Sequence, residues 1–359
     1  MQIELPISKS IANRLLILQA IHRDGLMTVS CGMPDDVRIM SEAIRLLGER
    51  REARIDLGNC GTAMRFLTAY CAQLEGQTVI LDGVERMHHR PIGQLVNALR
   101  EIGADIAYLG EEGFPPLRIK GCILDKHRIV TLNNPQSTQF VSALHLIGAN
   151  VQTNSTSPYI ALTREIIERY LQRVRRANYS EQSERSTVQR STVSIANEIE
   201  KDWSAAAFWY EYVALYGGEI TLPGLFRDSL QGDKVVADIF AHLGVSTQYT
   251  EEGIVIYSSP LRPTSYTLHQ DFASCPDLYP AVALTCERLG IELHATGTES
   301  LPIKESDRLR AVREHRTDHD HRMAMALLIA GYEVDDTACI SKSYPQFFEE
   351  WTKVIRSHE

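Results

Sequence analysis

Short clusters of lysine, arginine and hydroxyl side chains stand ahead of several apolar stretches. In PISKSIANR, Lys9 precedes Ser10 and Arg14, which are four residues apart and therefore share one face of a helix. In GNCGTAMR, two glycines that let backbone N–H groups approach a ligand closely precede Arg65. The planar guanidinium group of arginine can bind a carboxylate or a phosphate through two parallel N–H donors. These clusters predict binding sites for small anions.

The second half of the chain places acids beside the bases. IKESDRLR contains Lys304 next to Glu305, followed by Arg308. A lysine and a glutamate side by side can titrate usefully where a closing cleft excludes water. DHDHRMAM supplies Arg322, and CISKSYP supplies Lys342. A purely structural alternative stays open for the acids, because a carboxylate in a first helical turn also complements the helix dipole.

Six polar clusters are each followed at once by an apolar helical pattern, and helix N-termini attract phosphates and carboxylates. Ordinary capping by Ser, Thr and Asp is the alternative explanation for any one of them. Several also carry Lys or Arg, so we favour an anion-binding role for the set. The six stretches are SKSIANRLLILQAI, GNCGTAMRFLTAYCA, QSTQFVSALHLI, KDWSAAAFWYEYVAL, PDLYPAVALTC and DHDHRMAMALLIAG.

An internal repeat organises the chain. Residues 92–121 read as a helix that stops at Gly103, followed by two short strands across a turn. Residues 233–258 repeat this plan, and a third copy begins at Asp36 with a helix that stops at Gly48. Three copies of a helix leading into a hairpin indicate repeated α/β units.

Composition bounds the class of protein. The chain has 359 residues, of which 44% are hydrophobic, so we expect about two globular domains. The net charge of −9 argues against a nucleic-acid partner and against a basic membrane-surface protein. No run of apolar residues is long enough for a membrane span, and no secretion signal is recognisable. We therefore expect a cytoplasmic protein that acts on small molecules. We also expect a monomer, although this does not follow from the composition.

Metal sites and disulfides are not expected. The seven cysteines are scattered and form no CxxC pair. His315 and His319 have a metal-ligand spacing, but the neighbouring Arg316 and Arg322 disfavour a cation there. The polar stretch over 168–194 is rich in Arg and Ser, and its two aromatic residues, Tyr170 and Tyr179, are too few for the interleaved pattern that base stacking requires. A solvated helix running into a loop or edge strand is therefore favoured over RNA contact.

Seven motifs taken together resemble the 5-enolpyruvylshikimate-3-phosphate synthase family and occur in that family's order over nearly the whole chain. The sister family, the UDP-N-acetylglucosamine enolpyruvyl transferases, lacks the GNxGTAMR and DHRMAM pair and uses a cysteine loop that has no counterpart here. The motifs are SKSIANR, GNCGTAMR, RMHHRPIGQLVNALREIGA, STQF, SPYIALT, KESDRL and DHRMAMA.

The resemblance implies an α/β fold with two similar domains. Each would be built from repeated βαβαββ units as an inside-out α/β barrel of the enolpyruvyl transferase type, with a cleft that closes between the domains. We expect an inserted domain over 9–199, mainly for shikimate 3-phosphate. A discontinuous domain of 1–8 plus 200–359 would carry much of the phosphoenolpyruvate site.

The reaction implied is transfer of the enolpyruvyl group of phosphoenolpyruvate to the 5-hydroxyl of shikimate 3-phosphate, with release of phosphate. It is an addition followed by an elimination, so it requires proton transfers but neither a cofactor nor a metal. By resemblance, Asp277 is the base for the hydroxyl, and Glu305 exchanges a proton with the methylene carbon. Lys9 and Lys342 complete the catalytic set.

The resemblance also assigns the binding residues. Shikimate 3-phosphate would be held by Lys9, Ser10, Arg14, Ser137, Thr138, Gln139, Thr156, Asp277 and Lys304. Phosphoenolpyruvate would be held by Lys9, Gly61, Arg90, Gln139, Arg308, Arg322 and Lys342.

Departures from the family pattern are few and leave the charged set intact. Ile7 replaces a glycine, Thr138 and Thr156 each replace a serine, and Ser300 replaces an asparagine. The usual EGDASSA is EKDWSAA here. The alternative is a pseudoenzyme that binds anions without turnover, but such a protein would not require both Asp277 and Glu305.

Three segments are short against the family pattern: those after Gly48, between Ala149 and Ser155, and after His315. Either the protein contains further residues that this sequence leaves out at one or more of these places, which we favour, or the protein itself has lost them and is more compact than its family. A compaction after His315 would remove strands from one sheet and leave their neighbours with unpaired edges.

Overall fold

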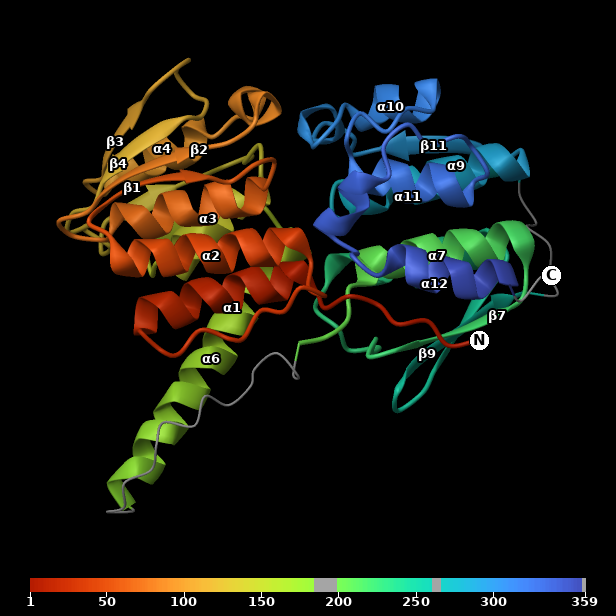
Figure 1. Ribbon diagram of the computed structural model, residues 1–359, viewed down its shortest axis with the longest axis horizontal. Helices are drawn as coiled ribbons and strands as arrows, with labels where there is room; N and C mark the ends of the chain where they lie inside the picture. The colour runs from red at the N-terminus through yellow and green to blue at the C-terminus, as the bar shows by residue number, and fades with distance from the viewer. Residues whose placement is uncertain (184–198, 260–265, 357–359) are drawn as a thin grey trace. The chain divides into compact units, whose positions relative to one another are not determined.

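The computed structural model describes residues 1–183, 199–259 and 266–356 (Figure 1). It mixes helices and strands and divides into two compact units. We call Ser10–Ser30 with Asp36–Ile199 the inserted unit, and Met1–Lys9, Cys31–Asp35 and Glu200–Glu359 the terminal unit. This grouping places Lys9 and Cys31–Asp35 in the terminal unit, whereas the sequence assigned them to the 9–199 domain.

The inserted unit contains one four-stranded sheet, whose strand order is β1-β2-β4-β3. The first two strands are parallel, because helix α3 (Gly61–Ala72) crosses between them, and β4 pairs antiparallel with both β2 and β3. Helix α4 (Gly93–Glu101) leads from β2 to β3, so the chain here follows the order βαβαββ. The strands are β1 (Glu52–Asp56), β2 (Thr78–Asp82), β3 (Asp105–Tyr108) and β4 (Leu117–Lys120).

The remaining strands of the inserted unit, as far as the structure describes it, form a parallel pair, β5 with β6. Helix α5 links the two strands and packs against α3 and α6. Both α3 and α5 are largely buried and so form the core of the unit. The elements are α1 (Lys9–His22), α2 (Asp35–Glu49), β5 (Ile129–Thr131), α5 (Thr138–Leu146), β6 (Asn150–Gln152) and α6 (Pro158–Ser183).

In the terminal unit, the N-terminal segment joins a sheet formed more than two hundred residues later. The backbone N–H of Ile3 donates to the carbonyl of Thr221, and Gln2 bridges to the same strand. That sheet has the antiparallel order β7-β9-β8. Its elements are β7 (Glu219–Pro223), α8 (Val236–His242), β8 (Val245–Tyr249) and β9 (Gly253–Ser258).

Three apolar helices, α7, α9 and α11, pack on one another in the core of the terminal unit. Helix α7 is buried on all sides over its first eleven residues, which fits a helix that is hydrophobic all round. Strands β10 and β11 form a parallel pair without a third strand among the residues described. The elements are α7 (Trp203–Tyr216), β10 (Thr267–Asp271), α9 (Tyr279–Leu289), β11 (Glu292–Thr296), α10 (Arg308–Glu314), α11 (His321–Ile329) and α12 (Phe347–Arg356).

The structure confirms that a helix follows each of the six polar clusters: α1, α3, α5, α7, α9 and α11. Two copies of the repeat are also confirmed, as α4 with β3 and β4 and as α8 with β8 and β9. The third copy was wrong in two respects. Helix α2 continues through Gly48 to Glu49, because a glycine without a positive φ does not end a helix. The single strand β1 follows it instead of a hairpin.

The Arg- and Ser-rich stretch begins as a helix, since α6 extends to Ser183. Its remainder lies outside the described residues. No helix within the described ranges is both long enough and apolar enough to cross a membrane.

Candidate functional site

Arg14 forms the centre of a polar cluster inside the inserted unit. Its Nε donates to the Thr163 hydroxyl at 2.7 Å, and Nη1 donates to the Ser10 carbonyl at 2.6 Å. Weaker bonds of 3.4 Å reach the Ser142 hydroxyl and the Tyr159 carbonyl. The guanidinium is 1% exposed. Helices α1, α5 and α6 thus combine to hold one cation.

The charge of Arg14 is not neutralised by these partners. All four hydrogen-bond acceptors of Arg14 in the described structure are neutral oxygens. Burial lowers the pKa of Arg14 to about 10, because desolvation disfavours the charged form. A buried cation without a carboxylate partner is a favourable place for an anionic ligand.

A second group in the inserted unit connects the starts of α3 and α5. Gln139 accepts a 2.6 Å hydrogen bond from Arg65 and donates at 2.9 Å to the Thr62 hydroxyl. Ser137 caps α5 by accepting from the Gln139 backbone N–H. The predicted residues of STQF therefore lie at a helix N-terminus, next to the GNCGTAMR motif.

Gly61 and Arg90 lie in direct contact in the same unit. A Cβ atom added to Gly61 would lie 2.5 Å from Nη2 of Arg90, so only glycine leaves room for this guanidinium. Arg90 donates at 3.2 Å to the carbonyl of Asn59. Thr156, in contrast, is exposed in the loop before α6.

In the terminal unit, Asp277 is bound by three cations. Arg308 donates to Oδ1 at 2.7 Å, Arg322 donates to Oδ2 at 2.9 Å, and Nζ of Lys304 lies 3.4 Å from Oδ1. Asp277 lies in a short 3-10 helix ahead of α9, whereas the cations come from α10, α11 and the loop before α10. The fold thus gathers residues that lie up to 45 positions apart in the sequence.

Arg308 and Glu305 extend this group. Besides Asp277, Arg308 bonds Asp320 at 2.8 Å and Glu305 at 3.2 Å. Glu305 in turn accepts from Lys342 at 3.0 Å. All the charged residues between 277 and 342 that the sequence assigned to catalysis or substrate binding therefore belong to one connected cluster, which we call the acid–base cluster.

Electrostatics in the acid–base cluster favour the charged forms. Burial alone would raise the pKa of Asp277, but Arg322, Lys304 and Arg308 hold it well below its usual range. Burial would lower the pKa of Arg308, but the surrounding carboxylates raise it instead. Asp277 is therefore ionised but tightly paired.

Lys9, the last residue of the N-terminal segment in this unit, lies beside His321. Its Nζ is 3.5 Å from Nε2 of His321. Burial lowers the pKa of His321 well below its ordinary value, and Lys9 and Arg322 lower it further, so the ring is neutral. Lys9 and the acid–base cluster thus both contact the start of α11.

Sequence reasoning missed several residues that support these clusters. Asp320 pairs with Arg308, yet we assigned it no role from the sequence. Thr163 and Ser142 surround Arg14 from helix interiors. A polar residue on the buried face of an apolar helix was the available signal. Asp233, fully buried beside Ser204, gave no signal of its own.

The two histidines with metal-ligand spacing contact different acidic partners. His315 contacts Glu287 at 2.8 Å and stacks on Tyr332, whereas His319 contacts Asp336. No group of three or more ligating side chains that could hold a metal occurs in the part of the chain that the structure describes.

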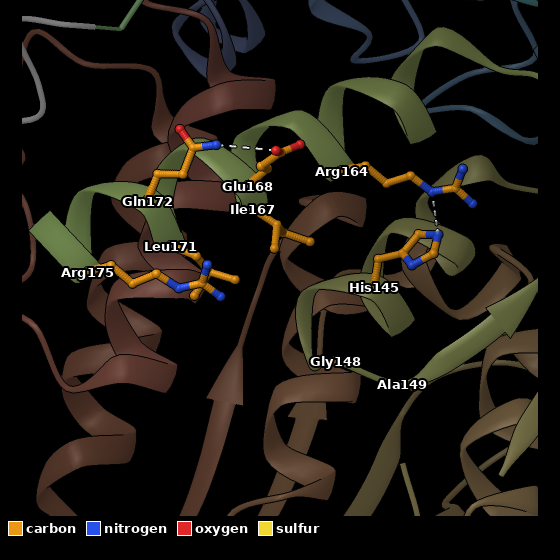
Figure 2. A pocket seen from close by; sticks show the side chains of 9 residues that line it. All are labelled: His145, Gly148, Ala149, Arg164, Ile167, Glu168, Leu171, Gln172 and Arg175. Carbon is orange, nitrogen blue, oxygen red and sulfur yellow. Dashed lines mark hydrogen bonds between the residues drawn. The ribbon is translucent and has the colours of Figure 1, made fainter. Parts of the chain in front are cut away.

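A separate hollow of about 390 Å³ lies in the inserted unit, between α6 and the end of α5. Figure 2 shows Arg164 directed toward His145, with which it shares a 3.2 Å hydrogen bond. Burial and the neighbouring Arg164 lower the pKa of His145 to about 4. None of the residues predicted to carry chemistry lines this hollow, so we do not assign the reaction to it.

Comparison with known proteins shows which family the chain is similar to. The model of the EPSP synthase family, described as 3-phosphoshikimate 1-carboxyvinyltransferase, matches residues 1–315 and 312–351. A protein of that name from Bacteroides fragilis is 37% identical over 397 residues, covering 98% of this chain and 94% of the relative. One from Colwellia psychrerythraea is 29% identical over 427 residues, covering 98% and 96%.

Solved structures agree at the level of the fold. The EPSP synthase of Acinetobacter baumannii superposes with a TM-score of 0.61 at 18% identity, covering 98% of this chain and 95% of that one. The alignment with the Bacteroides protein is 397 positions long although this chain has 359 residues, so the relative carries residues without a counterpart here. The family match also restarts at 312–315, beside the segment that the sequence marked as short.

Proposed function

The chain belongs to the EPSP synthase family, and we propose that the polar clusters described above bind the two substrates of the family's reaction. The enzyme transfers the enolpyruvyl group of phosphoenolpyruvate to the 5-hydroxyl of shikimate 3-phosphate and releases phosphate. This reaction is a step of the shikimate pathway of aromatic amino-acid biosynthesis. Both substrates are anions, which matches the cationic side chains of both clusters.

In this proposal, the cluster around Arg14 holds shikimate 3-phosphate. Its support is that Arg14 is buried without a carboxylate partner among the described residues, so an incoming anion supplies the missing charge. The N-terminus of α5 adds backbone N–H groups and two hydroxyls. The residues assigned here are Ser10, Arg14, Ser137, Thr138, Gln139 and Thr156, with Lys9, Lys304 and Asp277 from the terminal unit.

Phosphoenolpyruvate would be held by a second set of cations. Arg308, Arg322 and Lys342 belong to the acid–base cluster, whereas Arg90, Gly61 and Gln139 belong to the inserted unit. The chemistry of Arg308 and Arg322 supports this assignment, because a planar guanidinium group can bind a carboxylate or a phosphate through paired N–H donors. Lys9 would serve both substrates.

The pairing of Asp277 carries the catalytic part of the proposal. A carboxylate held by three cations is a weak base, because its lone pairs are engaged and its pKa is low. An anionic substrate competes for Arg308 and Arg322 and thereby releases Asp277 to accept the proton of the 5-hydroxyl. The substrate thus activates its own base.

Glu305 would handle the second proton. Its carboxylate lies between Lys342 and Arg308, at 3.0 and 3.2 Å. When the substrate's anionic groups draw these cations away, Glu305 can take up a proton from solvent, give it to the methylene carbon during addition and take one back during elimination. The cations also stabilise the negative charge of the departing phosphate.

The finer architecture and the cellular setting are part of the same proposal. The complete burial of α7 over its first eleven residues supports an inside-out arrangement, in which helices rather than strands occupy the core. We propose domains of 9–199 and of 1–8 plus 200–359, which differ from the two compact units only in the placement of Lys9 and Cys31–Asp35. We also propose a monomeric state and a cytoplasmic location. Light scattering after gel filtration and cell fractionation test the last two.

Phosphate release from the two substrates tests the catalytic assignment. We expect turnover by the unchanged chain and a loss of about 10²–10⁴-fold in Asp277→Asn and in Glu305→Gln, with substrate binding retained. Glu299→Gln is the matched control, because Glu299 is exposed and lies, like Glu305, in the connection between β11 and α10. Normal turnover in either active-site variant rejects that residue's role. No phosphate release by the unchanged chain would make it a binding protein.

A further inference from the structure

Asp233 is a fully buried carboxylate next to the acid–base cluster, and the mechanism above does not use it. It lies in a short 3-10 helix (Gly232–Val235) before α8 and is 1% exposed. Its Oδ2 accepts a hydrogen bond from the hydroxyl of Ser204, at the start of α7. Its Oδ1 is buried and has no hydrogen-bond partner in the described structure. Such a group is costly to keep charged.

The charges around Asp233 come from several elements of the terminal unit. Asp277 and Asp202 repel its negative charge, whereas Arg322 on α11 attracts it. Cys275, ahead of Asp277, is also close enough to be affected by the Asp233 charge. Burial and then Asp277 raise the pKa of Asp233 to about 6, although Arg322 and Ser204 act in the opposite direction.

Arg322 is therefore shared between several carboxylates. It donates to Asp277 at 2.9 Å, and Asp202 and Asp233 also stabilise its charge. Its Nε is buried and has no hydrogen-bond partner within the described ranges. Any anion that engages Arg322 reduces the compensation that Asp233 receives from it. The affinity of Asp233 for a proton must then increase.

We propose that Asp233 is a positioning residue that takes up a proton from solvent when phosphoenolpyruvate engages Arg322. This proposal rests on the assignment of Arg322 to that substrate. The proton binds the free Oδ1, no other bond changes, and the proton returns to solvent when phosphate and product leave. A neutral Asp233 no longer competes for Arg322, so the full charge of the guanidinium is available to the substrate.

Steady-state kinetics over a range of pH tests this role. Where binding takes up a proton, the KM for phosphoenolpyruvate rises as pH rises, by at most about tenfold per pH unit. We expect such a rise between about pH 6.5 and 8 in the unchanged enzyme and a clearly flatter profile in Asp233→Asn. Asp228→Asn, an exposed residue five positions away, should keep the original profile. Titration of the substrate itself is common to all three proteins and cancels in the comparison.

Different results would overturn the role of Asp233 and the assignment of Arg322 to phosphoenolpyruvate. An unchanged pH profile of KM in Asp233→Asn overturns the role of Asp233, whatever its effect on kcat. A merely structural role would lower activity by the same factor at every pH. Arg322→Lys tests the underlying assignment, because an unchanged KM for phosphoenolpyruvate in this variant would show that Arg322 does not hold the substrate.

A second variant keeps the test available if Asp233→Asn does not fold. Ser204→Ala retains the carboxylate but removes the donor that favours its charged form. Asp233 would then already carry its proton at a higher pH, so the rise in KM should move to higher pH. An unmoved profile in a folded Ser204→Ala enzyme overturns the proposal.

Discussion

Arg14 of the inserted unit and Arg308 of the terminal unit are both 1% exposed, yet their surroundings differ. Arg14 bonds hydroxyl and carbonyl oxygens, whereas Arg308 bonds three carboxylates. Burial therefore lowers the pKa of Arg14, while the carboxylates raise that of Arg308. An anion that reaches Arg14 supplies a missing charge, but an anion at Arg308 must displace one already bound.

The largest expected effect comes from making the same substitution in both units. Arg308→Met leaves Asp277, Glu305 and Asp320 without a shared cation, so we expect a loss of about 3–5 kcal/mol in the free energy of unfolding. Arg14→Met removes a desolvated charge and leaves only neutral acceptors, so its cost should be about 1 kcal/mol or less. Urea unfolding without ligands measures both. Equal losses would contradict the contrast between the units.

A smaller effect is expected at Arg90, a second cation of the inserted unit. In Gly61→Ala, the new methyl group would lie 2.5 Å from the Arg90 guanidinium and force it to move. A displacement of about 1 Å can cost up to about 10²-fold, so we expect the KM for phosphoenolpyruvate to rise about 10–100-fold. Gly48→Ala is the control, since nothing lies within 4 Å of its added Cβ. An unchanged KM would show that Arg90 is not a ligand of this substrate.

The smallest effect is predicted for a carboxyl group of the terminal unit that, unlike those of the acid–base cluster, is not paired with a cation in the described structure. Glu211 on α7 is fully buried, and neither carboxylate oxygen has a hydrogen-bond partner in the described part of the chain. Burial raises the pKa of Glu211 well above its ordinary value, so the folded protein holds a proton that the unfolded chain has lost at neutral pH. Its contribution to stability is therefore present at low pH and declines as pH rises.

Glu211→Gln removes this dependence. From about pH 6 to 7, the variant should gain on the unchanged protein by up to about 1.4 kcal/mol in the free energy of unfolding. Urea unfolding at the two pH values provides the measurement, and Glu251→Gln, an exposed site, is the control. If the difference between Glu211→Gln and the unchanged protein is the same at both pH values, Glu211 is ionised in the folded state.

Sequence reasoning identified the charged residues that come into contact better than it identified the residues that pack around them. The helix starts were predictable because capping residues and apolar periodicity are local signals. The acidic and basic residues from 277 to 342 were predicted as one functional set, and the fold brings them into contact. Thr163 could be recognised as a polar residue on a buried helix face but not as a partner of Arg14, because nothing local to a threonine specifies a contact 149 positions away. Asp233 was missed for the same reason.

The N-terminal segment has a consequence for protein synthesis. The N-terminal ammonium group of Met1 bonds the carbonyl of Glu219, which lies 218 positions further along the chain, and Ser8 bonds Glu200. At a translation speed of about 5–20 residues per second, this segment waits roughly 10–40 s on the ribosome before its partner strand exists. The inserted unit, whose residues are all made earlier, can form during this interval. The order of synthesis thus favours folding of the inserted unit first. Until its partner strand has been made, the N-terminal segment exposes unpaired backbone groups that another chain or a chaperone can bind.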